Sequence, residues 1–221
     1  MTYAGRLDPM ASGLILVLAG EEVRNKKKYL TLPKEYEFKI LFGFATDTYD
    51  ILGKIQHSHI LKNVGMLELE EKIKQNLKYF TGKFMQKYPL YSSKTVNGKQ
   101  LFEYGREGIE VKRPSREVLV SYFKFLKLKT ISGKKLLSNV EKRIKQVDGD
   151  FRQKEILKIW DRGLMGRKKE ALRFFTADFH IKCSSGTYVR VITNDLGVRL
   201  GVPALAFSIK RTKIGKWSKI T

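Results

Sequence analysis

Three separate segments of this chain alternate apolar and polar residues, and this pattern constrains the fold more than any other feature. The segments are residues 35–43, 175–183 and 205–209, which we expect to be β-strands. Residues 116–129 are rich in β-branched and aromatic side chains and predict one or two further strands. Amphipathic segments separate these strands without a regular strand–helix–strand order, so the pattern predicts an α+β fold rather than a doubly wound one.

Apolar residues at spacings of three and four predict the helices. Such spacing occurs in residues 66–80, 133–169 and 189–200. The Asp-Gly-Asp sequence at 148–150 is expected to divide the second segment into two helices, and residues 184–187 are expected to cap the helix that follows them. No internal repeat or long linker interrupts the 221 residues, which favours a single domain.

The chain is strongly basic, with 44 Lys and Arg against 22 Asp and Glu and a formal net charge of +22. Such an excess predicts binding to a polyanion, most simply nucleic acid. A membrane is less favoured, because no apolar stretch approaches the ~18 residues that span a bilayer and no N-terminal segment resembles a signal peptide. Residues 124–169 hold 15 Lys or Arg and 5 Asp or Glu. A solvated helical face and an RNA-facing one both fit this stretch.

The few cysteine and histidine residues limit disulfide formation and metal binding. Cys183 is the only cysteine, so no intramolecular disulfide can form and a reducing, cytoplasmic setting is expected. His57 and His59 form an H-x-H pair, but no further His or Cys clusters with them, and we expect a surface pair rather than a metal site. No glycine-rich loop with Walker spacing is present, which disfavours a nucleotide-driven machine.

Asp8 is the leading candidate for a reactive group. It lies in the sequence GRLDPMASGL, where Pro9 fixes its own φ and pushes Asp8 toward an extended conformation. Gly5 and Gly13 permit tight backbone geometry on either side, and residues 14–18 are expected to form a buried strand. An ordinary Asp-Pro turn is the alternative interpretation.

Four stretches in this order resemble the catalytic domain of the bacterial tRNA pseudouridine synthase family called TruB. They are residues 5–14, residues 34–53 with the sequences KEY and TDTYDILG, residues 88–108 and residues 183–201. The resemblance implies a mixed, largely antiparallel central sheet flanked by helices, with an RNA-contacting insertion. It also implies that residues 1–221 form one catalytic domain into which a basic helical stretch, about residues 130–170, is inserted.

The resemblance implies an enzyme that converts the T-loop uridine of tRNA to pseudouridine, without a cofactor or metal. Asp8 matches the essential aspartate of the family, and Arg190 matches the arginine that pairs with it. Tyr36 matches the tyrosine that stacks on the target base and is placed to help with proton removal at C5. From the pattern alone, Arg190 also fits an exposed basic residue and Tyr36 a core aromatic. We expect Asp8 and Arg190 to converge at the floor of one positively charged cleft.

The resemblance also implies the residues that bind the substrate. Tyr188 matches a second tyrosine of the pocket, Ile209 stands where the family usually carries a leucine against the base, and Asp50 fits either an ordering role in the site or a plain turn. Basic residues of the expected insertion would contact phosphates of the tRNA T-arm; they are Lys94, Lys99 and Arg106. The uridine must be extruded, and stacking on aromatic side chains offsets part of that cost. A monomer is expected.

The chain departs from the family pattern in three ways. Members usually begin earlier, with an additional strand, and many carry a small RNA-binding domain after the last motif. Tyr3 stands where members often have a histidine. An active synthase and a catalytically impaired tRNA-binding or folding module on the same scaffold are therefore both open, as is a synthase that acts on ribosomal RNA. The presence of Asp8, Tyr36 and Arg190 together favours the tRNA enzyme.

Overall fold

The computed structural model describes residues 1–59, 61, 65–164 and 172–218. Within these residues the centre is a seven-stranded sheet in the order β13–β12–β4–β11–β10–β7, with β2 paired to β12 off this path. Every pairing in the sheet is antiparallel except the one between β2 and β12. The strands are β2 Ala11–Gly13, β4 Lys34–Phe42, β7 Gly82–Lys87, β10 Ser115–Ser132, β11 Arg173–Cys183, β12 Ala204–Ile214 and β13 Trp217–Ser218. The predicted α+β class with a mixed, largely antiparallel sheet is confirmed.

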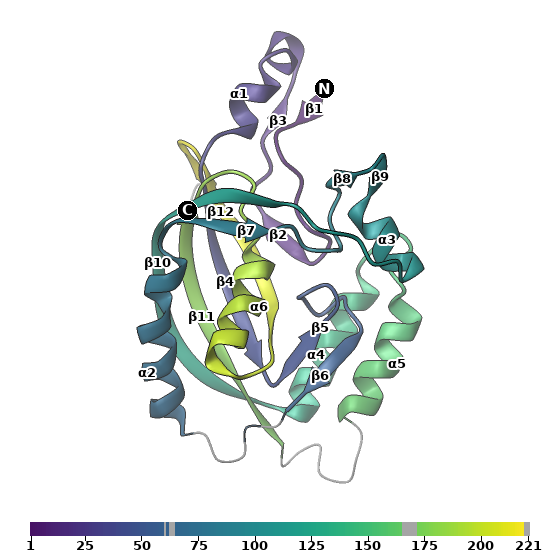
Figure 1. The fold of residues 1–221 in the computed structure, drawn as a ribbon, viewed down its shortest axis with the longest axis vertical. Helices are drawn as coiled ribbons and strands as arrows, with labels where there is room; N and C mark the ends of the chain where they lie inside the picture. The colour runs from purple at the N-terminus through teal and green to yellow at the C-terminus, as the bar shows by residue number, and fades with distance from the viewer. Residues whose placement is uncertain (60, 62–64, 165–171, 219–221) are drawn as a thin grey trace.

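Helices cover both faces of the sheet (Figure 1). Alternation along β4 sends Ile40 into one apolar cluster and Leu41 into another. The first cluster contains Ile73 of α2 and Ile192 of α6, and the second contains Trp160 of α5 together with residues of α4. The helices are α2 Met66–Asn76, α4 Gly133–Lys145, α5 Gln153–Leu164 and α6 Val189–Leu200. Burial of both faces is therefore what holds the sheet between the two helical layers.

The predicted basic helical stretch is a hairpin of two helices, α4 and α5, separated at residues 146–152 as expected. Residues 165–169 of the prediction lie outside the described residues. Strand β10 is one long strand that pairs with β7 near its start and with β11 near its end. It runs directly into α4, and Ser132 at its end is paired with Arg173 at the start of β11. The hairpin thus stands at the end of a two-stranded ribbon.

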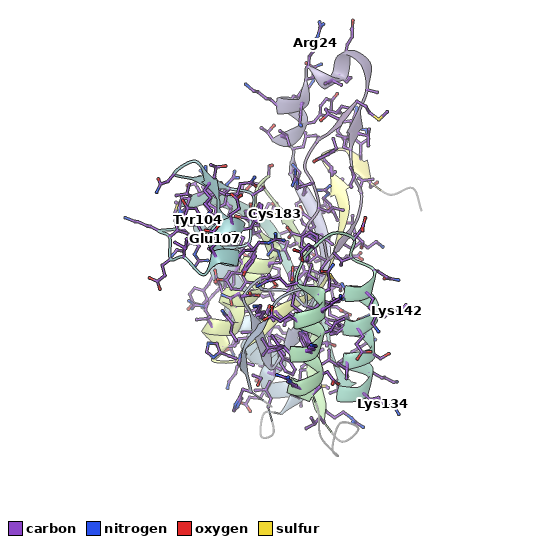
Figure 2. All side chains as sticks on the ribbon, turned by 90° about the vertical axis from the view of Figure 1, so that its right-hand side faces the viewer. Arg24, Tyr104, Glu107, Lys134, Lys142 and Cys183 are labelled. Carbon is purple, nitrogen blue, oxygen red and sulfur yellow. The ribbon has the colours of Figure 1, made fainter. Side chains whose placement is uncertain are left out.

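The prediction of a buried strand at residues 14–18 was wrong. Only Val17–Leu18 forms a strand, β3, and it pairs with β1, Thr2–Tyr3. These strands belong to an arm with η1 Gly20–Val23 and α1 Lys26–Leu30, which projects from the sheet (Figure 1). Ile15 is 47% exposed and Val17 56%, because the described structure places no second layer over the arm. Arg24 lies at its tip (Figure 2).

The prediction that residues 184–187 cap α6 was also wrong. The N-cap is Tyr188, which makes no side-chain capping bond. The Ser184 hydroxyl instead accepts a hydrogen bond from the Leu119 amide, at 2.9 Å, so this serine ties the loop to β10.

The remaining elements include a small hairpin and a short helix. Strands β5 Phe44–Thr46 and β6 Ile55–Ser58 pair with each other, and His57 and His59 are exposed, which confirms the surface pair. Helix α3, Leu101–Glu107, follows the short strands β8 Thr95–Val96 and β9 Lys99–Gln100. None of the described helices is long and apolar enough to cross a membrane.

Candidate active site

The loop that carries Asp8 is fixed by its neighbours in the sheet. Gly13 has φ +108°, and a Cβ built on it would lie 2.2 Å from the carbonyl oxygen of Arg211. Glycine is therefore required for β2 to lie this close to β12. The same parallel pairing places Ala11 opposite Ile209, and the Ala11 amide donates to the carbonyl of Asp8 at 2.8 Å. The turn after Asp8 is thus anchored beside β12.

Asp8 and Arg190 form a bidentate ion pair. Nε of Arg190 donates to Oδ2 of Asp8 at 2.7 Å, and Nη2 donates to Oδ1 at 3.0 Å. The Arg190 side chain is 4% exposed, whereas that of Asp8 is 33% exposed. The predicted convergence of the two groups is confirmed, and the alternative of an exposed Arg190 is excluded. The fork fixes the direction of the carboxylate and leaves Asp8 accessible.

Two backbone carbonyls complete the surroundings of Arg190. Its Nη1 donates to the carbonyl of Thr48 at 2.6 Å, and its Nη2 donates to that of Tyr91 at 3.3 Å. Burial by itself lowers the pKa of this arginine, but the charges of Asp8 and Asp50 outweigh burial and raise the pKa above its ordinary value. Arg190 is therefore a permanent, fully engaged cation.

Asp50 contacts both its own turn and Arg190. Its Oδ1 accepts from the Thr48 hydroxyl at 2.7 Å and from the Leu52 amide at 2.9 Å, which closes the turn. Its Oδ2 lies 3.7 Å from Nε of Arg190. Burial raises the pKa of Asp50, and Arg190 opposes that shift. The turn therefore also contributes a second carboxylate to the surroundings of Arg190.

A cavity of about 600 Å³ opens in front of this pair. Its size falls within the range of about 300–1,000 Å³ that is usual for small-ligand sites. Asp8, Tyr36, Asp50, Tyr188, Arg190 and Ile209 all line it. Burial raises the pKa of Tyr36 to about 12, and burial together with the Asp8 charge raises the pKa of Tyr188. Both phenols are therefore protonated at neutral pH and offer aromatic faces and hydroxyl donors to a ligand.

Only one of the three predicted phosphate-binding residues lines the cavity. Arg106 of α3 does so and donates to the Asp150 carbonyl. Lys94 is exposed, with its Nζ 5.7 Å from the ring centre of Tyr88. Lys99 pairs with Glu107. The two lysines thus lie before α3, outside the cavity.

The cavity residues that sequence reasoning missed include Lys34, Tyr91, Arg152 and Arg211. Arg211 donates to the carbonyls of Gly5 and Leu14, at 3.1 and 2.8 Å, so it holds both ends of the Asp8 loop. Lys34 donates to the Leu30 carbonyl at 2.7 Å, and burial with the charge of Arg211 lowers its pKa to about 8. Lys34 lies two residues before Tyr36 and Arg211 two residues after Ile209, so strand alternation places both on the same side of their strands as these pocket residues. The charge of the two side chains was the reason that burial was not expected.

Comparison with solved structures shows the fold class. The chain superposes on a chain of the crystal structure of a Cbf5–Nop10–Gar1 complex with a TM-score of 0.55 and 21% identity, covering 99% of this chain and 41% of the other. A structure of an H/ACA ribonucleoprotein bound to a substrate RNA containing 2′-deoxyuridine gives a TM-score of 0.50 at 19% identity, with 99% and 39% covered. The chain thus shares its fold with the matched chains of these two structures.

Comparison of sequences shows the family. Residues 1–142 match the model of the TruB family pseudouridylate synthases, N-terminal domain. The chain is 34% identical over 209 residues to tRNA pseudouridine synthase B of Lactobacillus acidophilus, covering 95% of this chain and 57% of that protein. Against the protein of the same name from Endomicrobium trichonymphae it is 32% identical over 212 residues, covering 96% and 71%. This chain belongs to the TruB family of pseudouridylate synthases, and it spans just over half the length of the Lactobacillus relative.

Proposed function

We propose that this protein is a tRNA pseudouridine synthase that isomerises the T-loop uridine without a cofactor. The observation that carries the proposal is the Asp8–Arg190 pair at the wall of the cavity, with the carboxylate accessible and the guanidinium buried. Relatives of about 30% identity are named tRNA pseudouridine synthase B, which agrees with this activity. We further propose that residues 1–221 act as one catalytic domain in which the α4–α5 hairpin is an insertion.

The reaction breaks the bond between ribose C1′ and N1 of the base and forms a bond between C1′ and C5 of the same base. The extruded uridine would enter the cavity and stack on Tyr36 and Tyr188, each worth about 1–3 kcal/mol. Asp8 then either adds to C1′ and is later displaced by C5, or removes the 2′ proton and returns it. In both routes N1 gains a proton and C5 loses one, so the isomerisation consumes no co-reactant.

Tyr36 is best suited to stacking. Because burial raises its pKa to about 12, its hydroxyl is protonated at neutral pH. It can accept the proton from C5 only if its own proton passes to another group. We therefore assign Tyr36 first to holding the base, and Ile209 and Tyr188 to the remaining walls of the pocket. Arg190 orients Asp8, and Asp50 orders the turn that holds Arg190.

We propose the T-arm of tRNA as the substrate surface and a monomer as the active form. The net charge of +22 supports a polyanionic partner. Arg106 lines the cavity, and Lys94 and Lys99 precede it in the segment from residue 94 to the end of α3, where all three would contact phosphates and set the position of the T-arm. Recognition would rely mainly on RNA shape.

The test is to incubate unmodified tRNA with the protein and to map pseudouridine by chemical labelling. We expect product at the T-loop with the parent and none with Asp8→Asn, which keeps the shape of the side chain but removes its charge. Glu71→Gln, at an exposed acidic residue of α2, is the control and should retain full activity. Tight tRNA binding by parent and Asp8→Asn without product from either would refute catalysis and leave a binding module. A ribosomal RNA fragment in parallel distinguishes the substrate class.

A further inference from the structure

The α4–α5 hairpin packs against the turn at residues 46–53, which holds the candidate active site. Ile51 and Leu52 of the turn lie in the same apolar cluster as Trp160 and Leu164 of α5. The indole nitrogen of Trp160 donates to the Ile51 carbonyl at 3.1 Å. At the far end of the turn, Lys54 pairs with Glu155 at 2.7 Å. The hairpin therefore contacts this turn through a hydrogen bond and an ion pair as well as through apolar packing.

Arg152, in the loop that joins α4 to α5, binds two side chains outside the hairpin. One nitrogen of Arg152, Nη1, donates to Oδ2 of Asp47 at 2.8 Å and to the hydroxyl of Tyr91 at 2.8 Å. The guanidinium also lies over the Tyr91 ring, 4.5 Å from its centre. The side chains of Arg152 and Asp47 are 19% and 12% exposed. Arg152 therefore joins two segments that are distant in sequence.

These two segments are the ones that hold Arg190. Its guanidinium donates to the carbonyl of Thr48, next to Asp47, and to the carbonyl of Tyr91 itself. Arg152 thus binds side chains of the same two segments whose backbone carbonyls accept from Arg190. A shift of either stretch would move the acceptors that orient Arg190 and, through Arg190, the carboxylate of Asp8.

We propose that Arg152 is a positioning residue for the Asp8–Arg190 pair, and that the α4–α5 hairpin is a structural part of the active site rather than a surface addition. This inference rests on the proposed function for its kinetic consequence, but its structural content stands without it. A second contact links the hairpin to the site: Arg143 of α4 donates to the Met10 carbonyl in the Asp8 loop, at 3.4 Å.

A direct phosphate contact by Arg152 is the competing role, and its partners argue against it. The charge of Arg152 is already met by the Asp47 carboxylate, and its pKa is raised because Asp47 and Tyr91 outweigh the effect of burial. Arg106 is the neighbouring arginine whose bond is to a neutral carbonyl, that of Asp150. An RNA phosphate would thus meet less competition at Arg106 than at Arg152.

The two roles predict different kinetics. We expect Arg152→Gln to lower kcat by about 10²-fold while KM for tRNA changes by less than about threefold. Arg152→Lys, which keeps the charge but lacks the planar fork, should recover only a small part of kcat. Lys158→Gln, at an exposed residue of α5, is the control and should match the parent. A raised KM with unchanged kcat, or full activity in Arg152→Lys, would overturn the proposal.

A second measurement does not depend on turnover. The Nε–H proton of Arg190 is buried against Asp8, so its NMR signal should exchange slowly with water, and loss of the signal in Arg190→Lys would assign it. We expect faster exchange in Arg152→Gln and not in Lys158→Gln. Unchanged exchange would refute the inference. If the parent makes no pseudouridine but this exchange still depends on Arg152, the proposed function fails and the positioning role stands.

A further variant covers the case in which Arg152→Gln does not fold. Tyr91→Phe removes the hydroxyl that accepts from Arg152 and keeps the ring over which the guanidinium lies. We expect Tyr91→Phe to lower kcat and to speed up exchange of the Arg190 Nε–H proton, both by less than Arg152→Gln does. Parent-like values for both would count against the proposal.

Discussion

Three buried cations surround the cavity, and the chain satisfies them in different ways. Arg190 meets two carboxylates, whereas the hydrogen bonds of Lys34 and Arg211 given by the described structure go to neutral oxygens. A buried charge without a paired carboxylate is disfavoured, which is why the pKa of Lys34 falls from 10.5 to about 8. An arginine in such surroundings stays charged, so Lys34 is the one of these three cations whose protonation changes near pH 8.

The lowered pKa of Lys34 predicts a pH-dependent contribution to stability. Between about pH 8 and pH 10.5 the unfolded chain binds a proton on Lys34 that the folded chain does not. The stability contributed by Lys34 therefore increases as pH rises from 8, and it is lowest and constant well below pH 8. Urea unfolding of the parent and of Lys34→Met at pH 7, 8 and 9 checks this. The difference in unfolding free energy should shift only slightly in favour of the parent from pH 7 to 8 and more strongly from pH 8 to 9. A difference that does not change up to pH 9 would contradict the assigned burial.

The fate of single residues shows what sequence could and could not predict. The convergence of Asp8 and Arg190 was predictable because the motifs that carry them are distinctive and occur in the family order. Asp50 was left undecided because a turn residue and a site residue look alike in sequence. Arg152 was missed because its role depends on where a helical hairpin packs, and no local pattern encodes that long-range contact.

At the scale of elements, the parallel pairing of β2 with β12 determines where the Asp8 carboxylate lies. Three residues of β2 pair with β12, and Gly13 makes the approach possible by leaving room for the Arg211 carbonyl. Strand alternation predicted β4, β11 and β12 correctly, because each is packed on the core. The expectation of a buried strand from the apolar run at residues 14–18 failed, because this run belongs to the arm and not to the core.

Gly13→Ala should therefore be far more damaging than an alanine at another glycine of positive φ. Gly98, with φ +79° and no atom within 4 Å of a built Cβ, is the matched control. We expect Gly98→Ala to lower the unfolding free energy by about 1–2 kcal/mol. Gly13→Ala should cost a further ~1–3 kcal/mol from overpacking and should lower kcat at least about tenfold, because the Asp8 loop is displaced. Equal effects in urea unfolding and in the pseudouridine assay would argue against this account of the loop.

At the scale of the whole molecule, positive charge is distributed over the surface rather than confined to the cavity. Lys134 and Lys142 lie on the outward side of α4 (Figure 2), whereas the apolar side of the hairpin packs on the sheet and on the turn. The sequence could not choose between a solvated and an RNA-facing hairpin, and the structure shows that the inner side of the hairpin packs on the turn at residues 46–53. Overall charge predicts attraction to RNA but not the orientation in which RNA binds.

Affinity for tRNA should fall steeply with salt, since each neutralised phosphate contributes about −0.7 to −0.9 to the slope of log K against log salt. Lys94 is an exposed lysine just before β8. Lys94→Gln should reduce the magnitude of this slope by about 0.7 to 0.9. Lys72→Gln on α2, at the opposite side of the molecule from α3 (Figure 1), is the control and should leave the slope unchanged. Filter binding from low to physiological salt measures both. A flat response in the parent would refute electrostatic docking.

The junction of β10 and β11 with the helical hairpin has an evolutionary consequence. Because Ser132 and Arg173 are direct cross-strand partners, the chain leaves and rejoins the ribbon at one point. Exchange of everything between them for a tight turn would leave the register of the strands unaltered, but it would uncover the apolar cluster that α4 and α5 bury on that face of the sheet. A relative that kept the Asp8–Arg190 pair without this module would need a new cover for Leu41 and Leu205 and a new contact for Asp47, so changes at these distant positions are expected to be inherited together.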